Sequence, residues 1–187
     1  RRVGGMKQLL LIFAVVMGQS VLAADEKPLI AGPIVEKAIR ERIQKPKGEL
    51  TKADLEKVRH LSLSGTKITD AGLKEVAKLK RLKTLGLWNT KITDAGLKDI
   101  AKLQKLTHLD LTLTEITDSG LKEVAKLQKL KTLWVSDTQI TDAGLKDIAK
   151  LKQLTELYLT DTQVTKAGVA ELKKALPNCT IYSNPKK

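Results

Sequence analysis

The sequence is poor in cysteine and in aromatic residues, and both shortages limit the kind of protein it can form. Cys179 is the only cysteine, so no disulfide can form within the chain. Aromatic residues make up 3% of the 187 residues, and the single phenylalanine, Phe13, lies in an apolar run near the N-terminus. A chain of this length is sufficient for one domain, whose core must be aliphatic.

The N-terminal residues have the pattern of a targeting signal. Three basic residues precede an unbroken apolar run at residues 9–17, and Val21 and Ala23 have the spacing that signal peptidase accepts. The pattern predicts a signal peptide over residues 1–23, cleaved after Ala23, with residues 1–5 as an extension upstream of the start. We expect a secreted or periplasmic protein. A retained membrane anchor is the alternative, but the run is shorter than the about 20 residues that span a bilayer, so no stable insertion is expected after cleavage.

The chain is strongly basic. Its 34 Lys and Arg residues outnumber 21 Asp and Glu residues, which leaves a formal charge of +13. Such a surplus suits nucleic acid or another anionic partner, so the placement of the charges decides what it means.

One unit recurs along the chain every 24 residues. Its most regular segment, Ile-Thr-Asp-Ala-Gly-Leu-Lys, occurs at 68–74, 92–98 and 140–146, with Ser replacing Ala at 116–122 and a degenerate copy at 164–170. Within each unit the apolar spacing changes from alternation, which is typical of a half-buried strand, to the i, i+3, i+4 spacing of a helix. The Thr-Asp pair supplies an N-cap and a first-turn carboxylate for that helix.

The alternating half of the unit reads Leu-x-x-Leu-x-Leu-x-x-Thr-x-Ile at residues 82–92 and 106–116, and recurs at 154–164 with Val164 in place of Ile. In this form it resembles the leucine-rich repeat signature, with Thr where Asn or Cys is commoner. The Ile-Thr-Asp-x-Gly-Leu half is similar to the cysteine-containing, F-box-type subclass. The resemblance implies an α/β leucine-rich repeat solenoid, with a parallel β-sheet on the concave face and α-helices on the convex face.

A solenoid exposes apolar surface at both ends and needs caps. We expect the solenoid over residues 58–182, a helical N-terminal cap over 24–57 and a tail over 183–187. Apolar spacing predicts one amphipathic cap helix, and a capping box at Thr51 predicts a second. This cap resembles those of internalin-type bacterial repeat proteins. At the other end, Cys179 takes a buried Leu position, which favours a structural role over a reactive or metal-binding thiol.

A threonine follows each predicted strand, at Thr66, Thr90, Thr114, Thr138 and Thr162. Buried polar groups need partners, so we expect these hydroxyls to satisfy backbone groups between neighbouring coils.

Strand alternation identifies the side chains of the concave face. Both tryptophans, both tyrosines and both histidines fall there. Aromatic side chains are typical of binding hot spots, although their preference for strands is an alternative explanation. The candidate ligand-binding residues are Trp88, Asn89, His108, Asp110, Trp134, Asp137, Glu156, Tyr158, Asp161 and Tyr182.

Charge separates between the two faces. The predicted concave positions hold acidic residues and neither Lys nor Arg, so the surplus positive charge belongs to the convex helices and the loops. Phosphate contacts need Lys or Arg, so we expect no nucleic acid on the concave face.

The concave face offers no set of residues for catalysis. His108 shares that face with Asp110, but side chains two apart on a strand point in parallel and do not converge on one atom. Asp137 and Asp161 are neighbours that could share a cation, yet a hard cation needs six or more oxygens, which favours solvated carboxylates. The sequence also has no metal-ligand, phosphate-loop or nucleophile motif. We therefore expect no enzyme, metal or cofactor.

These observations predict an exported, monomeric and non-enzymatic binding module that recognises a protein or peptide on its concave face. The first alternative is a structural envelope protein whose basic convex face adheres to anionic cell-wall polymer. The second is an adaptor in protein turnover, suggested by the F-box-like subclass, which a signal peptide argues against.

Overall fold

The computed structural model of this chain describes residues 28–185. The predicted signal peptide, its cleavage after Ala23 and the last two residues of the predicted tail lie outside the described residues. Across the described range, every helix is too short or too polar to cross a membrane.

The chain alternates short strands with short helices. Two helices come first and each later strand is followed by one helix, except the last. The elements are α1 (Pro33–Ile43), α2 (Lys52–Lys57), β1 (His60–Ser62), α3 (Asp70–Val76), β2 (Thr84–Gly86), α4 (Asp94–Ile100), β3 (His108–Asp110), α5 (Asp118–Val124), β4 (Thr132–Trp134), α6 (Asp142–Ile148), β5 (Glu156–Tyr158), α7 (Lys166–Ala175) and β6 (Thr180–Tyr182).

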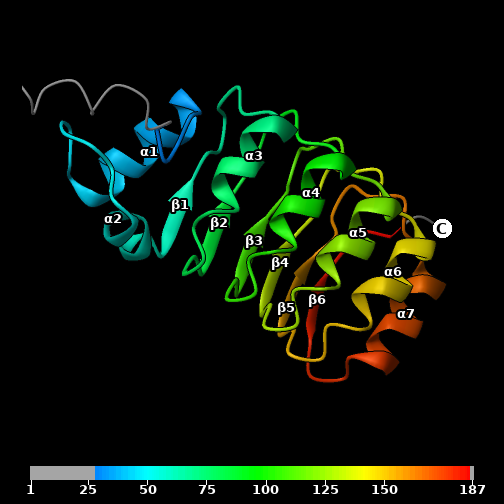
Figure 1. The fold of residues 1–187 in the computed structure, drawn as a ribbon. Coiled ribbons are helices and arrows are strands. Elements are labelled where there is room, and N and C mark those ends of the chain that lie inside the picture. The colour runs from blue at the N-terminus through cyan, green and yellow to red at the C-terminus, as the bar shows by residue number, and fades with distance from the viewer. Residues whose placement is uncertain (1–27, 186–187) are drawn as a thin grey trace, which may run out of the picture.

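The strands form one parallel sheet in sequence order, β1 to β6. Each strand pairs with the next at a displacement of 24 residues, as in Leu61 beside Leu85 and Leu85 beside Leu109. Helices α3 to α7 follow one another along the outer side of the curve while the strands line the inner side (Figure 1). The predicted α/β leucine-rich repeat solenoid is confirmed.

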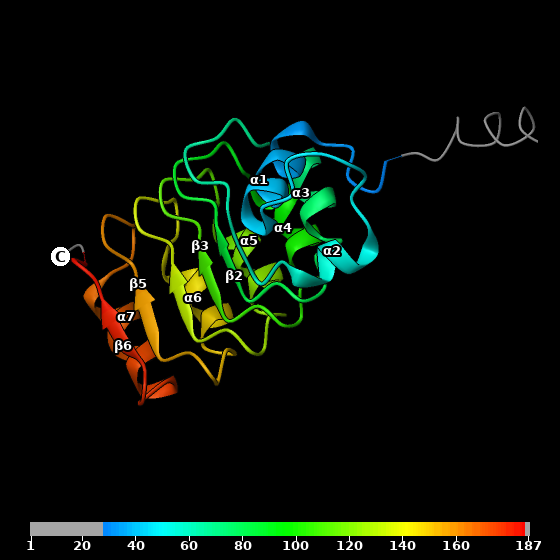
Figure 2. The ribbon, with the colours of Figure 1, turned by 90° about the vertical axis from the view of Figure 1, so that its left-hand side faces the viewer.

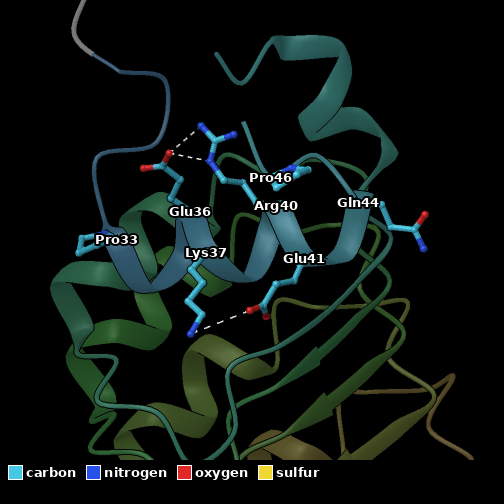
Figure 3. A pocket seen from close by; sticks show the side chains of 7 residues that line it. All are labelled: Pro33, Glu36, Lys37, Arg40, Glu41, Gln44 and Pro46. Atoms are coloured by element: carbon cyan, nitrogen blue, oxygen red, sulfur yellow. Dashed lines mark hydrogen bonds and ion pairs between the residues drawn. The ribbon is translucent and has the colours of Figure 1, made fainter. Parts of the chain in front are cut away.

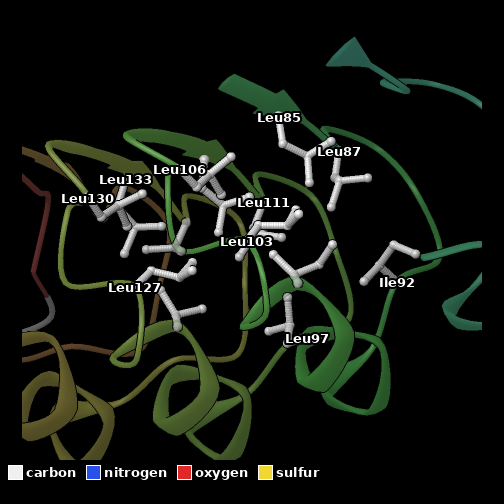
Figure 4. Close-up of a cluster of buried hydrophobic side chains, with 14 of the residues drawn as sticks. Leu85, Leu87, Ile92, Leu97, Leu103, Leu106, Leu111, Leu127, Leu130 and Leu133 are labelled. Atoms are coloured by element: carbon white, nitrogen blue, oxygen red, sulfur yellow. The ribbon is translucent and has the colours of Figure 1, made fainter. Parts of the chain in front are cut away.

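The space between sheet and helices is filled by aliphatic side chains, mainly leucine (Figure 4). In the second coil, Leu85 and Leu87 point inward from the strand while Leu97 and Ile100 come from α4, and all four are almost completely buried. Each buried leucine contributes about 2 kcal/mol of hydrophobic stabilisation. Because every coil repeats this set, the core runs the length of the solenoid without interruption.

On the convex side, a carboxylate of each coil binds the threonine that begins the next helix. Asp94 accepts a hydrogen bond from the Thr117 backbone N–H at 2.8 Å through Oδ1, and from the Thr117 hydroxyl at 2.6 Å through Oδ2. The same pair of bonds recurs at Asp70–Thr93, Asp118–Thr141 and Asp142–Thr165. The Thr-Asp motif therefore joins the coils besides capping α4, α5 and α6.

This contact also explains the glycine of the repeated motif. A Cβ atom at Gly120 would lie 2.4 Å from Asp94 Oδ1 and 2.8 Å from Leu97 Cδ1. Any side chain here would push the two helices apart and break the bonds to Thr117. The glycine is thus needed for close approach between coils.

The threonines after the strands do not bridge coils, so that expectation was wrong. The Thr90 hydroxyl donates to the Leu87 carbonyl of its own coil at 2.7 Å. Thr66, Thr114, Thr138 and Thr162 do the same with the carbonyl three residues earlier. The threonine bond closes the turn within one coil. The contact with the next coil is made by Asp side chains such as Asp94.

Two helices cover the N-terminal end of the solenoid, and a buried cysteine lies in its last coil. Helix α1 buries Val35 and Ile39 against the first coil, and α2 begins at the predicted capping box of Thr51 and Asp54. At the far end Cys179 is 3% exposed, as predicted for a Leu position. Burial, followed by the charge of Glu156, raises the pKa of the Cys179 thiol to about 11, so it stays protonated at neutral pH.

Replacing Asp94 with Ala tests the contact between coils. We expect Asp94→Ala to lower the free energy of unfolding by about 2–3 kcal/mol, because two hydrogen bonds to a charged acceptor are lost and Thr117 is left without its partner. Asp99→Ala on the same helix is the matched control, since within residues 28–185 Asp99 makes one ion pair, with Lys102 of its own coil, and its loss should cost less than about 1 kcal/mol. Urea unfolding followed by circular dichroism measures both; equal losses would contradict the assignment.

The cap should lose stability in acid. Lys45, the Thr51 N–H and hydroxyl, and Lys57 hold the pKa of Asp54 well below its ordinary 3.8. A carboxylate with a lowered pKa contributes stability that is complete above about pH 5 and is lost as the pH falls below about 4. Asp54→Asn should therefore be less stable than the wild type at pH 7 and lose less stability down to pH 3. Thermal unfolding across this range measures the difference, with Glu49→Gln, an exposed acid of the loop before α2, as control.

Candidate interaction surface

Two columns of side chains cover the concave face of the sheet. Because strand residues alternate, each central leucine points into the core and its two neighbours point outward. The first column is His60, Thr84, His108, Thr132, Glu156 and Thr180, and the second is Ser62, Gly86, Asp110, Trp134, Tyr158 and Tyr182. Six of the ten predicted site residues therefore lie in register on the strands, namely His108, Asp110, Trp134, Glu156, Tyr158 and Tyr182.

Three of the predicted aromatic residues form a stack. The rings of Trp134 and Tyr158 lie 5.4 Å apart, and those of Tyr158 and Tyr182 lie 4.5 Å apart, with interplanar angles of 17° and 12°. The 24-residue displacement between strands produces this arrangement, because it sets like positions side by side. Trp88 lies two residues beyond Gly86, outside the stack, and is 43% exposed.

The turns after the strands form a rim along the face. One residue of each turn is left-handed: Gly65, Asn89, Leu113, Asp137 and Asp161 have φ between 52° and 67°. Gly, Asn and Asp tolerate this region, whereas Leu does not favour it. Leu113 is also 45% exposed. The sequence predicted that Leu113 points outward on the concave side, but Leu113 was not among the predicted ligand-binding residues, although a Leu among Gly, Asn and Asp at one repeat position was a signal.

The acidic residues of the face have different surroundings. Asp110 accepts the Thr112 backbone N–H through Oδ1 at 2.9 Å, and Asp161 accepts the Asn184 amide at 2.9 Å. Glu156 accepts the Tyr158 hydroxyl at 3.3 Å. Burial among its neighbours, and then the Glu156 charge, raise the pKa of Tyr158, so its hydroxyl remains a donor. Within residues 28–185 no three His, Cys, Asp or Glu side chains gather closely enough to hold a metal ion.

The two histidines lie on separate strands and bind threonines. His60 Nδ1 is 2.9 Å from Thr84 Oγ1, and His108 Nδ1 is 2.8 Å from Thr107 Oγ1. Neither ring is hydrogen-bonded to a carboxylate or to a serine hydroxyl in the described part of the chain. The face thus presents hydrogen-bonding and stacking groups to a ligand, without a nucleophile held by a base.

The N-terminal half of the face contains a pocket of about 470 Å³. Strands β1 to β4 supply most of its lining, and α1 adds Arg42. The expectation of a concave face without Lys or Arg was therefore incomplete, because the cap helix carries a basic residue to its edge. Figure 2 shows the cap standing at the β1 end of the sheet.

A larger hollow, of about 680 Å³, lies on the outer face of α1 (Figure 3). Its charged residues satisfy each other: Arg40 pairs with Glu36 at 2.8 Å and Lys37 with Glu41 at 4.0 Å. The concave pocket differs, since Arg42 and Asp110 form no ion pair among the described residues. Unpaired charges and an aromatic wall make the concave pocket the better candidate for ligand binding.

Comparison with solved structures finds the same fold in two bacterial proteins. An internalin, InlF, from Listeria monocytogenes has a TM-score of 0.64 and 22% identity over 89% of this chain and 55% of its own. A leucine-rich repeat protein from Leptospira interrogans has a TM-score of 0.55 and 29% identity over 71% of this chain and 33% of its own. The chain thus spans about half of the internalin and a third of the Leptospira protein.

No curated protein matches this sequence. A family model described as a leucine-rich repeat region matches residues 47–178, which include helices α2 to α7 and strands β1 to β5. The matched part contains the repeated strands, the buried leucines and the convex helices described above. This chain therefore belongs to the leucine-rich repeat family.

Proposed function

We propose that this protein is an exported, non-enzymatic binding module that recognises a protein or peptide on its concave face. Export rests on the basic residues, apolar run and small residues of the first 23 positions. The leucine-rich repeat fold itself favours a protein-interaction role, because a solenoid presents an extended, curved surface.

One observation carries the proposal. Trp88, Leu113 and Tyr182 are the large apolar side chains that are exposed within residues 28–185, and all three lie on the strand side of the solenoid or at its rim. The convex side has none of them. Exposed apolar side chains that gather on one face of a protein mark an interaction site, and aromatic ones dominate binding energy.

The backbone at Leu113 supports this assignment. A left-handed conformation costs a branched, non-glycine residue about 1 kcal/mol, and an exposed side chain offsets none of it by burial. Backbone strain of this kind is retained where the side chain contributes to binding.

Envelope adhesion through the convex face is the second candidate, and one pattern favours it. Lys74, Lys98, Lys122 and Lys146 recur every 24 residues on successive helices and are exposed. None of the four forms an ion pair in the described structure, whereas Lys78, Lys102, Lys126 and Lys150 each pair with an acid three residues earlier. Four regularly spaced free charges could hold an anionic polymer.

Leu113→Asn should make the protein more stable. Asn is the residue at the equivalent position of the preceding coil, Asn89, and tolerates the left-handed region. We expect a gain of about 0.5–1 kcal/mol in the free energy of unfolding, measured by urea denaturation. The reciprocal change, Asn89→Leu, should cost a similar amount, and a stabilising Asn89→Leu would contradict the strain.

The same change should weaken binding. Partners captured by the tagged protein from native extract are identified, purified and titrated against the wild type, Trp88→Ala and Leu113→Asn. We expect at least about tenfold weaker affinity for each variant, because each loses exposed apolar contact surface at the proposed interface.

A double variant, Lys98→Gln with Lys122→Gln, distinguishes the two candidates. It should bind the purified partner as the wild type does. Unchanged affinity of the Trp88 and Leu113 variants would overturn concave-face binding. In a second assay, the proteins are co-sedimented with cell-wall material. Salt-sensitive binding by the wild type, lost in the lysine variant alone, would instead establish adhesion through the convex face.

A further inference from the structure

A missing side chain creates the concave pocket. In the second column, Gly86 stands between Ser62 and Asp110, so the column has a gap on β2. A Cβ atom at Gly86 would lie 3.0 Å from Ser64 Oγ and 3.4 Å from Ser62 Oγ. Serine hydroxyls therefore border the gap on one side, and the side chains of β3 and β4 border it on the other.

Trp134 forms an aromatic wall of this pocket. One face of its indole is covered by the nearly parallel ring of Tyr158 on β5. The opposite face is directed toward β3, where Asp110 is the residue in register with Trp134. No ring or cation covers that second face among the described residues, so it is free to contact a ligand.

Two opposite charges line the pocket without neutralising each other. Arg42 reaches it from α1 and Asp110 from β3, and no ion pair involving either is present in residues 28–185. One oxygen of Asp110 accepts the Thr112 N–H, which leaves the other for a ligand. Asp110 is two strands away from β1, or about 10 Å at the usual strand spacing.

We propose that this pocket binds a dipolar peptide segment, whose carboxylate contacts Arg42 and whose guanidinium lies between Asp110 and the free face of Trp134. A guanidinium such as that of Arg42 binds a carboxylate through two parallel hydrogen bonds. A tryptophan face beside a carboxylate attracts a cation. The inference rests on the proposed function and specifies the chemistry of the peptide.

The width of the pocket sets the length of the segment. Helix α1, which carries Arg42, contacts β1, and Asp110 lies two strands further on, about 10 Å from β1 at the usual strand spacing. An extended chain advances about 3.3 Å per residue, so charged residues three apart in sequence span about 10 Å. A segment of four residues with an acid at one end and arginine at the other therefore matches the pocket, and the pocket volume of about 470 Å³ is within the range of small-ligand sites.

The test uses two capped tetrapeptides, Glu-Gly-Gly-Arg and Arg-Gly-Gly-Glu, titrated into the nitrogen-15-labelled protein. The chain has two tryptophans, so two indole N–H signals report binding, and Trp88→Phe assigns them. We expect one of the two peptides to shift the Trp134 signal saturably while that of Trp88, which does not line the pocket, stays in place. The order that binds reveals the direction of the segment.

Single charges are then removed from each side. Arg42→Gln should weaken the binding peptide about fivefold to tenfold and leave a peptide with Gln in place of Glu unaffected. Asp110→Asn should weaken the binding peptide by a similar factor and leave a peptide with Gln in place of Arg unaffected. Arg81→Gln, an exposed arginine paired with Glu56 outside the pocket, is the matched control and should change nothing.

A Trp134 signal that no peptide moves, or equal binding of the neutralised peptides, would overturn the pocket assignment. Full affinity for the captured partner in Arg42→Gln and Asp110→Asn, together with lost affinity in Trp88→Ala, would reject this pocket while retaining the proposed function. Full affinity in all three variants would reject both.

Discussion

Neighbouring coils of this solenoid depend on one hydrogen-bonded contact, in which the carboxylate of Asp94 or its equivalent receives the backbone N–H and hydroxyl of a threonine in the next coil. The contact needs a glycine such as Gly120 opposite it, since a Cβ there would displace the carboxylate. It sets the spacing of the convex helices, and through them the register of a sheet whose strands have three residues each. A strand of three residues makes few pairing hydrogen bonds of its own, so the contact between the helices adds to the pairing of the strands.

The residues that hold the coils together leave the concave face free to vary. Aliphatic positions fill the core and the Asp, Thr and Gly positions join the helices, so both sets recur in nearly every coil. The second concave column instead changes from strand to strand, from a serine and a glycine through a carboxylate to two aromatic rings, at Ser62, Gly86, Asp110, Trp134 and Tyr158. Architecture demands only that these side chains point outward. Their differences therefore suit recognition of a partner rather than stability.

Much of the fold could be predicted because its determinants are local and periodic. The 24-residue period implied the register, and alternation within the unit identified Asp110, Trp134 and Tyr158 as neighbours on one face. The prediction for Thr90 was wrong because its hydroxyl is closer to the carbonyl three residues earlier, which it binds, than to another coil. The bonds that Thr117 donates to Asp94 were missed because a helix N-cap already explained both residue types.

The sequence by itself determined the repeat, the aliphatic core and the face that carries the aromatic residues, because each follows from spacing along one chain. Tertiary structure alone decided that Arg42 enters the concave pocket, since the orientation of α1 against the first coil depends on how Val35 and Ile39 pack. It also decided that Leu113 is left-handed, because the carbonyl of Ser136 in the next coil fixes its N–H. The cap helix and the repeats have different sequence patterns, so the 24-residue period does not indicate how they contact each other. The binding surface depends on such contacts.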